Sequence, residues 1–412
     1  MDQGFDDIFK EMPFFEGGLK DSVYNCNDGV WELLISATSP GMLARYEHKL
    51  EQNGYKRMRQ NCYNGNRYAI YRDAEEQRDL FLSYTAHDCV SRIAASPCVA
   101  LLPEKAEQTE RVCDPLFSML ALGQLENGEN NGAEAFGVSF VIRLEDGRFI
   151  VIDGGTNLPT EVDRLYRTLE KYHTGGEQIV IAAWLLTHPD GDHWGCFYGF
   201  SQKYAHQVKL EKILYNIYHE SAENGMRASA CGVGKRVHDV YVREIADHLD
   251  CDQLIKLHTG QRFFIGSVQL EVLYTHEDLY PAPLVYTNDS SVVVRLTIGG
   301  KTFLLPADIE GAGTAQLVAQ CGEYLKSDYV QVIHHGWRGT TLPQIRFNQI
   351  YYQTFYELAD AETALWSAQL DQKHYDLLTK ADASVAGSVN WLKANVRQML
   401  STEDGDQTIM WK

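Results

Sequence analysis

The sequence predicts a layered α/β protein with a small α+β module at its N-terminus, and three observations lead to this prediction. Residues 178–186 form a nearly continuous apolar run, which is typical of a strand buried on both faces. Hairpin patterns and helical patterns alternate beyond residue 111, which favours sheets covered by helices. The chain has 412 residues, a length for which two domains are expected.

We expect residues 1–110 to form the small α+β module. Residues 31–36 alternate like a strand, and Ser39 with Pro40 then provides the N-cap and first position of a helix. Strand-like residues 55–63 and 68–71 are joined by Asn64-Gly65-Asn66, which is hairpin chemistry. The stretch 96–110, with two prolines and several charges, is the predicted linker. No catalytic constellation is visible before it, so we expect the module to shape the substrate site, mediate dimerisation or brace the main domain.

Residues 111–412 form the predicted main domain. Its first part combines a hairpin with the helix 162–172 and the buried strand 178–186. We expect a further helix over residues 385–400. The other expected strands are 139–144, 148–152, 212–216, 268–274, 291–298, 302–306, 329–333, 361–366 and 407–411.

Composition and charge limit the possible partners. Apolar residues make up 44% of the chain and charged residues 23%, as in a globular protein with a core. The net charge of −19 repels polyanions, so we expect a small-molecule substrate rather than a long nucleic acid. Nine scattered cysteines without a CxxC pair indicate a reducing compartment. The acidic N-terminus resembles no secretory signal, and no apolar run approaches the roughly 18 residues of a membrane span, so we expect a cytoplasmic protein without membrane contact.

The strongest chemical signal lies immediately after the buried strand. His188, Asp190, Asp192 and His193 place four potential metal ligands within six residues, and Pro189 with Gly191 permits the sharp loop that they require. Imidazole and carboxylate together suit zinc, manganese or iron. An acidic helix N-cap beside two surface histidines is the alternative interpretation of this segment alone.

Three other predicted strands also end in ligand-type residues. Asp153 ends one strand, Asp308 follows the run 303–306, and His334 with His335 follows the run 329–333. Sites in layered α/β proteins assemble at the carboxyl ends of strands. These endings therefore favour a metal centre over the surface interpretation.

These residues resemble the motifs of the metallo-β-lactamase superfamily, from about residue 137 to the C-terminus. Asp153-Gly154-Gly155 resembles the first motif of the family. The second motif, usually HxHxDH, is similar to residues 188–193, where Asp190 replaces the second histidine. That replacement, Asn288-Asp289-Ser290-Ser291, and the elements around Asp308 and residues 334–336 look most like the domain of competence DNA-uptake channel proteins and phosphorylcholine esterases.

The resemblance implies a four-layer αββα sandwich of two mixed sheets with a dinuclear centre. His188 and Asp190 would bind one metal ion, and Asp192 and His193 the second. Asp308 would bridge the two ions. The implied cofactors are two divalent ions, with zinc first and manganese or iron as alternatives.

One histidine of the pair after residue 333 would complete the second metal. We expect extended backbone there, which turns successive side chains to opposite faces, so we assign His335 as the ligand and His334 to the substrate side. Asp153 would orient a ligand rather than bind metal.

The sequence departs from the family where a third-motif histidine is usual. Asn288 and Asp289 occupy that stretch, and His276 lies a dozen residues earlier, where we expect it only to end a strand. Asp289 is the candidate replacement for this histidine. Without the histidine the first metal has a weak ligand set, so we expect that ion to be weakly held. Asn288 and Arg338 are candidates for holding substrate, although an ordinary surface arginine is an equal alternative for Arg338.

The expected function is hydrolysis of a phosphodiester or small phosphate ester by a metal-bound hydroxide, with Asp192, His334 and Asp289 as catalytic residues. Two metals suit in-line displacement at phosphorus. Three alternatives stay open: hydrolysis of a lactone, thioester or amide, non-haem iron redox chemistry, and a decayed scaffold without activity. Fold-level analogy does not choose among substrates.

Overall fold

The computed structural model describes residue 9 and residues 12–26, 28–75, 77–98, 100–122, 137–176, 178–218, 242–337, 342–368 and 383–411. Three sheets organise these residues. None of the described helices combines the length and apolar character needed to cross a bilayer.

The N-terminal sheet is antiparallel and has the strand order β1-β2-β6-β5-β4-β3. Its helix α2 begins as the sequence predicts, because the Ser39 side chain accepts a hydrogen bond from the Met42 amide and Pro40 follows. The predicted hairpin around residues 64–66 is confirmed as β3–β4. The elements are β1 (Leu19–Asn25), β2 (Trp31–Ser36), α2 (Pro40–Gln52), β3 (Lys56–Tyr63), β4 (Asn66–Arg72), β5 (Arg78–Thr85) and β6 (Val90–Pro97).

The second sheet has eight strands in the order β13-β12-β10-β9-β8-β7-β21, with β11 paired to β10. Strands β9, β10, β12 and β13 are parallel, so their carboxyl ends share one edge. Its strands are β7 (Leu116–Met119), β8 (Ser139–Arg143), β9 (Phe149–Asp153), β10 (Ile179–Leu186), β11 (Val208–Leu210), β12 (Lys212–Tyr215), β13 (Gln253–Lys256) and β21 (Gln407–Met410). Its helices are α3 (Pro159–Tyr172), α4 (Gly191–Tyr204) and α6 (Arg243–His248).

The third sheet has seven strands in the order β14-β15-β16-β17-β18-β19-β20, and its last four strands are parallel. The strands are β14 (Arg262–Ile265), β15 (Val268–Tyr274), β16 (Val293–Ile298), β17 (Lys301–Leu305), β18 (Tyr329–Gln331), β19 (Thr363–Trp366) and β20 (Gln398–Ser401). The helices are α7 (Gly311–Cys321), α8 (Leu342–Ala359) and α10 (Ala383–Asn395).

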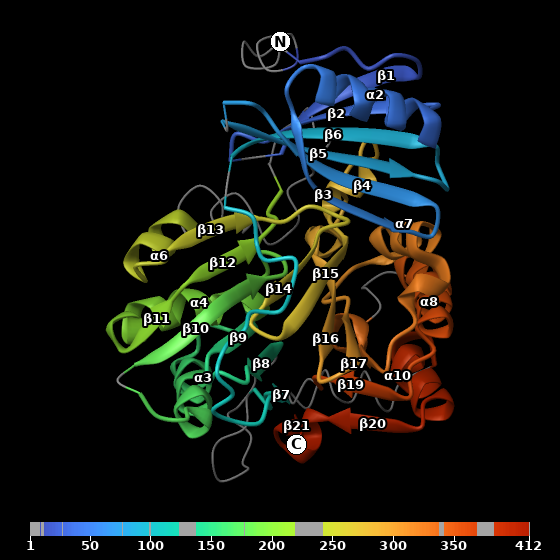
Figure 1. Ribbon diagram of the computed structural model, residues 1–412. Helices are drawn as coiled ribbons and strands as arrows, with labels where there is room; N and C mark the ends of the chain where they lie inside the picture. The colour runs from blue at the N-terminus through green and yellow to red at the C-terminus, as the bar shows by residue number, and fades with distance from the viewer. Residues whose placement is uncertain are drawn as a thin grey trace.

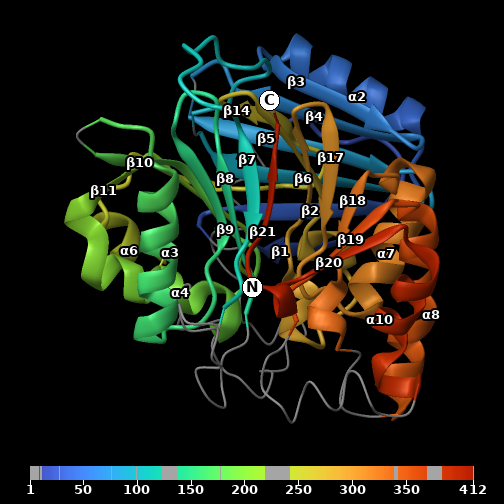
Figure 2. The same cartoon turned by 90° about the horizontal axis from the view of Figure 1, so that it is seen from below.

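The second and third sheets pack face to face, and helices cover their outer faces (Figure 2). One apolar core, which includes Phe140, Ile152, Leu270 and Phe303, lies between the two sheets. A second core joins α3 and α4 to the second sheet, and a third joins α7, α8 and α10 to the third sheet. The protein therefore has the αββα sandwich that the sequence predicts.

The prediction of one helix over residues 385–400 is wrong at its C-terminal end. Helix α10 ends at Asn395, and residues 398–401 form β20, which pairs with β19 in parallel. The backbone groups of residues 398–401 find their partners in a neighbouring strand, which no local sequence pattern reveals.

The N-terminal sheet lies across β13, β14 and β15 (Figure 1). Buried polar groups hold this contact. Arg92 of β6 donates to the carbonyl oxygens of Asp278 (2.9 Å) and Tyr280 (3.2 Å), and its Nε lies 3.8 Å from Glu32 Oε1. Lys256 of β13 lies 3.4 Å from Glu277 and donates to the carbonyl of Cys26. This contact depends on pairing of buried charges, which costs stability when one partner is removed.

Replacing Arg92 with alanine should lower the free energy of unfolding by about 3 kcal/mol, because two carbonyls lose a buried donor and buried Glu32 loses its nearby positive charge. Chemical denaturation of the full chain measures this change. Lys326→Ala is the control, since Lys326 and Asp360 form an exposed pair that solvent screens. An Arg92→Ala protein with the denaturation midpoint of the wild type would contradict the assignment.

Candidate metal centre

The loop after β10 carries half of the centre. All but one residue of β10 is buried, and the chain then turns through Thr187 and His188 into α4, which begins after Asp190. His188 and His193 are almost fully buried, although an unpaired imidazole gains nothing from burial. Their placement therefore needs a partner inside the protein.

Asp153 holds this loop in place. The residue ends β9 with a left-handed backbone (φ 54°). Its Oδ1 accepts from the Thr187 amide (2.9 Å), and its Oδ2 accepts from the Thr187 hydroxyl (2.7 Å) and lies 2.8 Å from His193 Nδ1. A carboxylate only accepts, so His193 donates from Nδ1 and directs Nε2 away as the ligand atom. The Asp153 carboxylate therefore fixes the orientation of the His193 ring.

Four side chains converge beyond His193. Asp192, His193, Asp308 and His335 each offer one ligand atom, and these atoms lie within 4.8 Å of one another. His193 Nε2 is 3.1 Å from Asp308 Oδ2, and His335 Nε2 is 3.2 Å from Asp192 Oδ2 and 3.4 Å from Asp308 Oδ2. Two imidazoles and two carboxylates form a donor set for zinc, manganese or iron.

Unpartnered atoms support a metal ion at this cluster. Nε2 of His193, Nε2 of His335 and Oδ1 of Asp308 are buried and make no hydrogen bond. Burial opposes charge on His335, but Asp308 and Asp192 outweigh it and raise its pKa to about 9. The same carboxylates raise the pKa of His193 against its burial. A divalent ion would replace these protons and satisfy the orphaned atoms.

His188 and Asp190 lie beside this cluster. The His188 ring is 4.2 Å from the His193 ring, and His188 Nε2 is 3.9 Å from Asp190 Oδ2. The Thr187 hydroxyl donates to Asp153, so it accepts from His188 Nδ1 (3.1 Å) and leaves His188 Nε2 free as a ligand atom. Burial, followed by the charge of His193, lowers the pKa of His188 to about 3, so its ring is neutral as metal binding requires.

Asp190 is the carboxylate of this second pair. Burial and then the charge of Asp192 raise the pKa of Asp190 to about 7, and its Oδ1 has no hydrogen-bond partner. With Asp308 Oδ1 also unpartnered, His188, Asp190 and Asp308 are the residues that could hold a second ion. This second pair thus has fewer ligands than the four-residue cluster.

The backbone at His334 and His335 differs from the prediction. Both residues have left-handed conformations (φ 49° and 53°) in a kinked turn, not extended backbone. The structure brings His335 into the cluster, with Nδ1 3.1 Å from the Ser367 hydroxyl. The His334 side chain is 19% exposed, against 1% for His335, and its Nε2 is 3.7 Å from Asp308 Oδ2. His334 therefore lies at the accessible side of the centre.

Asn288 and Asp289 lie in the turn that precedes β16, and Asn288 contacts His334. Asp289 Oδ1 accepts from the amides of Glu310 (3.0 Å) and Gly313 (2.8 Å) and holds the start of α7. The structure thus does not bring Asp289 into the four-residue cluster. Asn288 Nδ2 is 3.4 Å from His334 Nε2 and 3.4 Å from Glu310 Oε1. Arg338 lies outside the described residues.

Glu310 is a neighbour of the centre that the sequence analysis missed. It is buried, and its Oε1 lies 3.6 Å from His334 Nδ1. A signal was present in the sequence, because Glu310 follows the predicted ligand Asp308 by two residues on the same loop.

His276 has no part in the cluster. It follows β15, as predicted, and both of its ring nitrogens are buried without hydrogen-bond partners. Burial lowers its pKa to about 3, while the nearby charges of Glu277, Lys256 and His258 act in opposing directions. His276 is therefore a neutral packing residue.

The comparisons with known proteins agree with this fold. Residues 133–279 match the model of the metallo-beta-lactamase superfamily, a stretch that includes Asp153 and residues 188–193 but ends before Asp308. Residues 133–279 are thus similar to this superfamily, and the match covers less than half of the chain. No curated protein sequence shows a significant match to this chain.

Solved structures with a similar fold are distant. The metallo-beta-lactamase fold protein YhfI from Bacillus subtilis is 11% identical, with a TM-score of 0.41, and the match covers 73% of this chain and 100% of that one. The diiron β-hydroxylase CmlA from Streptomyces venezuelae is 12% identical, with a TM-score of 0.40, and the match covers 74% of this chain and 55% of CmlA. A flavo di-iron protein mutant from Thermotoga maritima is 13% identical, with a TM-score of 0.28, over 60% of this chain and 54% of that one. The diiron and flavo di-iron chemistries in these names are properties of CmlA and of the Thermotoga maritima protein.

Acid should destabilise the protein through His276. Its pKa in the unfolded chain is about 6.5, so the unfolded state binds the proton more tightly. Stability is complete above pH 6.5 and falls as the pH drops from 6.5 toward 3. Between pH 7 and pH 5, the free energy of unfolding of the wild type should fall by about 2 kcal/mol more than that of His276→Phe. Phenylalanine fills the site with an aromatic ring that does not titrate. Chemical denaturation at both pH values tests this, and equal losses would contradict it.

Removing Asp308 should empty the centre, because its carboxylate lies within reach of both His193 and His335. Elemental analysis of tag-free protein should find about one to two metal equivalents in the wild type and a small fraction of that in Asp308→Ala. Asp360→Asn, a change in an exposed ion pair, should keep the wild-type metal content. Wild-type protein that takes up no metal on reconstitution would refute the centre.

Proposed function

We propose that the protein is a metal-dependent hydrolase of a phosphodiester or small phosphate ester. The observation that carries the proposal is the convergence of Asp192, His193, Asp308 and His335 with buried ligand atoms that lack other partners. Divalent ions bound there would supply a water of lowered pKa and would neutralise charge that develops on a phosphoryl oxygen. Zinc is the proposed metal, with manganese or iron as alternatives.

Asp192 and His334 are the proposed catalytic groups of the chain. Asp192 is the partly exposed member of the cluster and lies 3.2 Å from His335. Its carboxylate can therefore accept a proton from a water molecule at the centre. His334 can donate from Nε2 to a substrate oxygen, because that atom faces the centre and its side chain is the more exposed of the pair. Asn288 Nδ2, which is a donor 3.4 Å from His334 Nε2, is placed to donate to a substrate oxygen.

Asp289 has a positioning role in this proposal. Its Oδ1 anchors the start of α7, next to Glu310, and Glu310 in turn lies beside His334. Loss of Asp289 would therefore displace the accessible side of the centre without removing a metal ligand.

Phosphate esters are favoured over other substrates by two features of the sequence. The motif order resembles the competence and phosphorylcholine esterase branch, in which phosphodiesters are the substrates. The net charge of −19 opposes a long nucleic acid but permits a small soluble ester. We also propose that residues 1–110 form a separate module, since none of the strands in the N-terminal sheet pairs with the other two sheets.

The wild type, loaded with zinc or manganese, should hydrolyse bis(p-nitrophenyl) phosphate, and a chelator should abolish the activity until metal is returned. His334→Asn should keep its metal but lower kcat about a hundredfold, as expected when a proton donor is lost. Lys326→Gln is the matched surface control. Faster hydrolysis of p-nitrophenyl acetate or a lactone would favour the other hydrolase class. Bound iron without hydrolysis would favour redox chemistry, and neither metal nor activity would indicate a decayed scaffold.

A further inference from the structure

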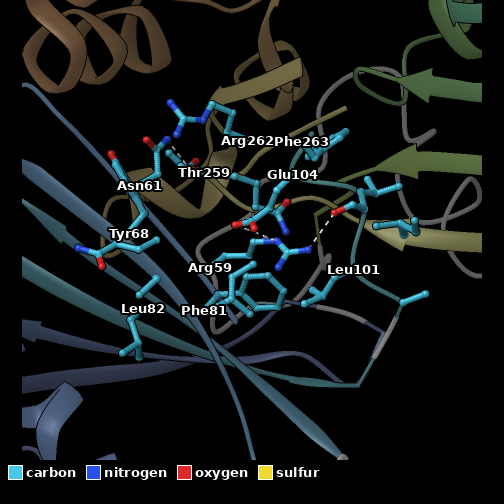
Figure 3. A pocket seen from close by; sticks show the side chains of 18 of the residues that line it. Arg59, Asn61, Tyr68, Phe81, Leu82, Leu101, Glu104, Thr259, Arg262 and Phe263 are labelled. Atoms are coloured by element: carbon cyan, nitrogen blue, oxygen red, sulfur yellow. Dashed lines mark hydrogen bonds and ion pairs between the residues drawn. The ribbon is translucent and has the colours of Figure 1, made fainter. Parts of the chain in front are cut away.

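A cavity of about 290 Å³ lies between the N-terminal sheet and the sandwich, away from the metal centre (Figure 3). Its walls come from β3–β5, from the connector at residues 100–105, and from the turn between β13 and β14. None of the metal-centre residues lines it. The volume is close to the lower end of the range for small-molecule sites.

Aromatic and aliphatic side chains form the inner part of the cavity. Phe81 of β5 and Phe263 of β14 are both buried and come from opposite sides of the contact. Ile70 and Ile255 add aliphatic surface from the same two sides. A flat apolar body would therefore be contacted by both parts of the protein.

The charged groups around the cavity are mainly cationic. Arg59, Lys105 and Arg262 contribute three positive charges, and Glu104 is the single carboxylate of the lining. Glu104 Oε1 lies 3.4 Å from Arg59 Nε and offsets only one of the three. In a chain with a net charge of −19, this is a local reversal of sign.

The cations are placed where a ligand could meet them. Arg59 is fixed by donation to the carbonyls of Met58 (2.8 Å) and Leu102 (3.3 Å), and Figure 3 shows its guanidinium beside Phe81. Lys105 and Arg262 are exposed, so they lie toward solvent at the opening. A guanidinium next to an aromatic wall suits a carboxylate or phosphate attached to a ring.

We propose that this cavity is a second binding site, for a small organic anion with a flat apolar body and a carboxylate or phosphate group. The body lies between Phe81 and Phe263, and the acidic group meets Arg59, while exposed Arg262 and Lys105 add positive charge around the cavity. Because the walls belong to both parts of the chain, the bound anion links the N-terminal sheet to the sandwich and stabilises their contact. The N-terminal sheet then serves as a ligand-dependent brace of the metal-binding part.

The test uses 8-anilinonaphthalene-1-sulfonate, a flat aromatic anion, with the full chain in excess chelator. We expect saturable fluorescence enhancement with one site per chain. Arg59→Gln should weaken the affinity about tenfold, as expected for a lost charge-assisted contact, and Arg262→Gln should weaken it less, because it removes only a nearby positive charge. Ala100→Trp, a change at an exposed lining residue, should block binding by filling the cavity.

Two controls separate this site from other surfaces. Lys326→Gln, which removes an exposed cation outside the lining, should bind the dye as the wild type does. Asp308→Ala should also bind normally, so failure of the metal centre and failure of this proposal are distinguishable. The proposal is overturned if the wild type shows no saturable binding, if Ala100→Trp binds unchanged, or if the neutral N-phenyl-1-naphthylamine binds equally well in all variants.

Discussion

The carboxylate of Asp153 is the contact on which the metal centre depends. A buried carboxylate must be fully hydrogen-bonded, and its partners here are the backbone and hydroxyl of Thr187 and the imidazole of His193. These contacts fix the loop between β10 and α4. Backbone bonds then extend the arrangement, since the Cys196 amide donates to the Gly155 carbonyl and the Val292 amide donates to the Thr187 carbonyl. One carboxylate thereby sets the ligand direction of His193 and ties its loop to the third sheet.

The centre is divided between two sheets. Asp192 and His193 follow a strand of the second sheet, whereas Asp308 and His335 follow neighbouring parallel strands of the third. The apolar core between these sheets therefore determines the spacing of the ligand atoms. Left-handed backbone at Ala307, His334 and His335 gathers at the same edge. Such conformations cost about 1–3 kcal/mol each, so the packing of the sheets has to hold them.

Much of this centre was predictable from the sequence, because each ligand lies within a few residues of a buried apolar strand. The four-layer order and the placement of Asp153 and His335 follow from that pattern and the family resemblance. Other features depend on distant contacts. Residues 398–401 form a strand only beside β19, the turn at His334 and His335 is not extended, and Asp289 is engaged at the start of α7. The cavity also could not be predicted from the sequence, since its lining residues come from segments far apart in the chain that meet only where the two parts pack.

The polar character of the contact between the N-terminal sheet and the sandwich follows from the strands that it covers. Strands β13 and β14 are the edge strands of their sheets, and edge strands carry backbone groups that need partners or attract other chains. The connector supplies partners along β14, where the Phe264 amide donates to the Pro103 carbonyl, and at the adjoining turn, where the Glu107 amide donates to the Gly266 carbonyl. Arg92 donates a hydrogen bond to the Asp278 carbonyl, and Asn61 donates one to the Gly260 carbonyl. The cavity adjoins these hydrogen bonds, because Asn61 and Gly260 are among its lining residues, so a ligand there would contact residues that join the two parts of the chain.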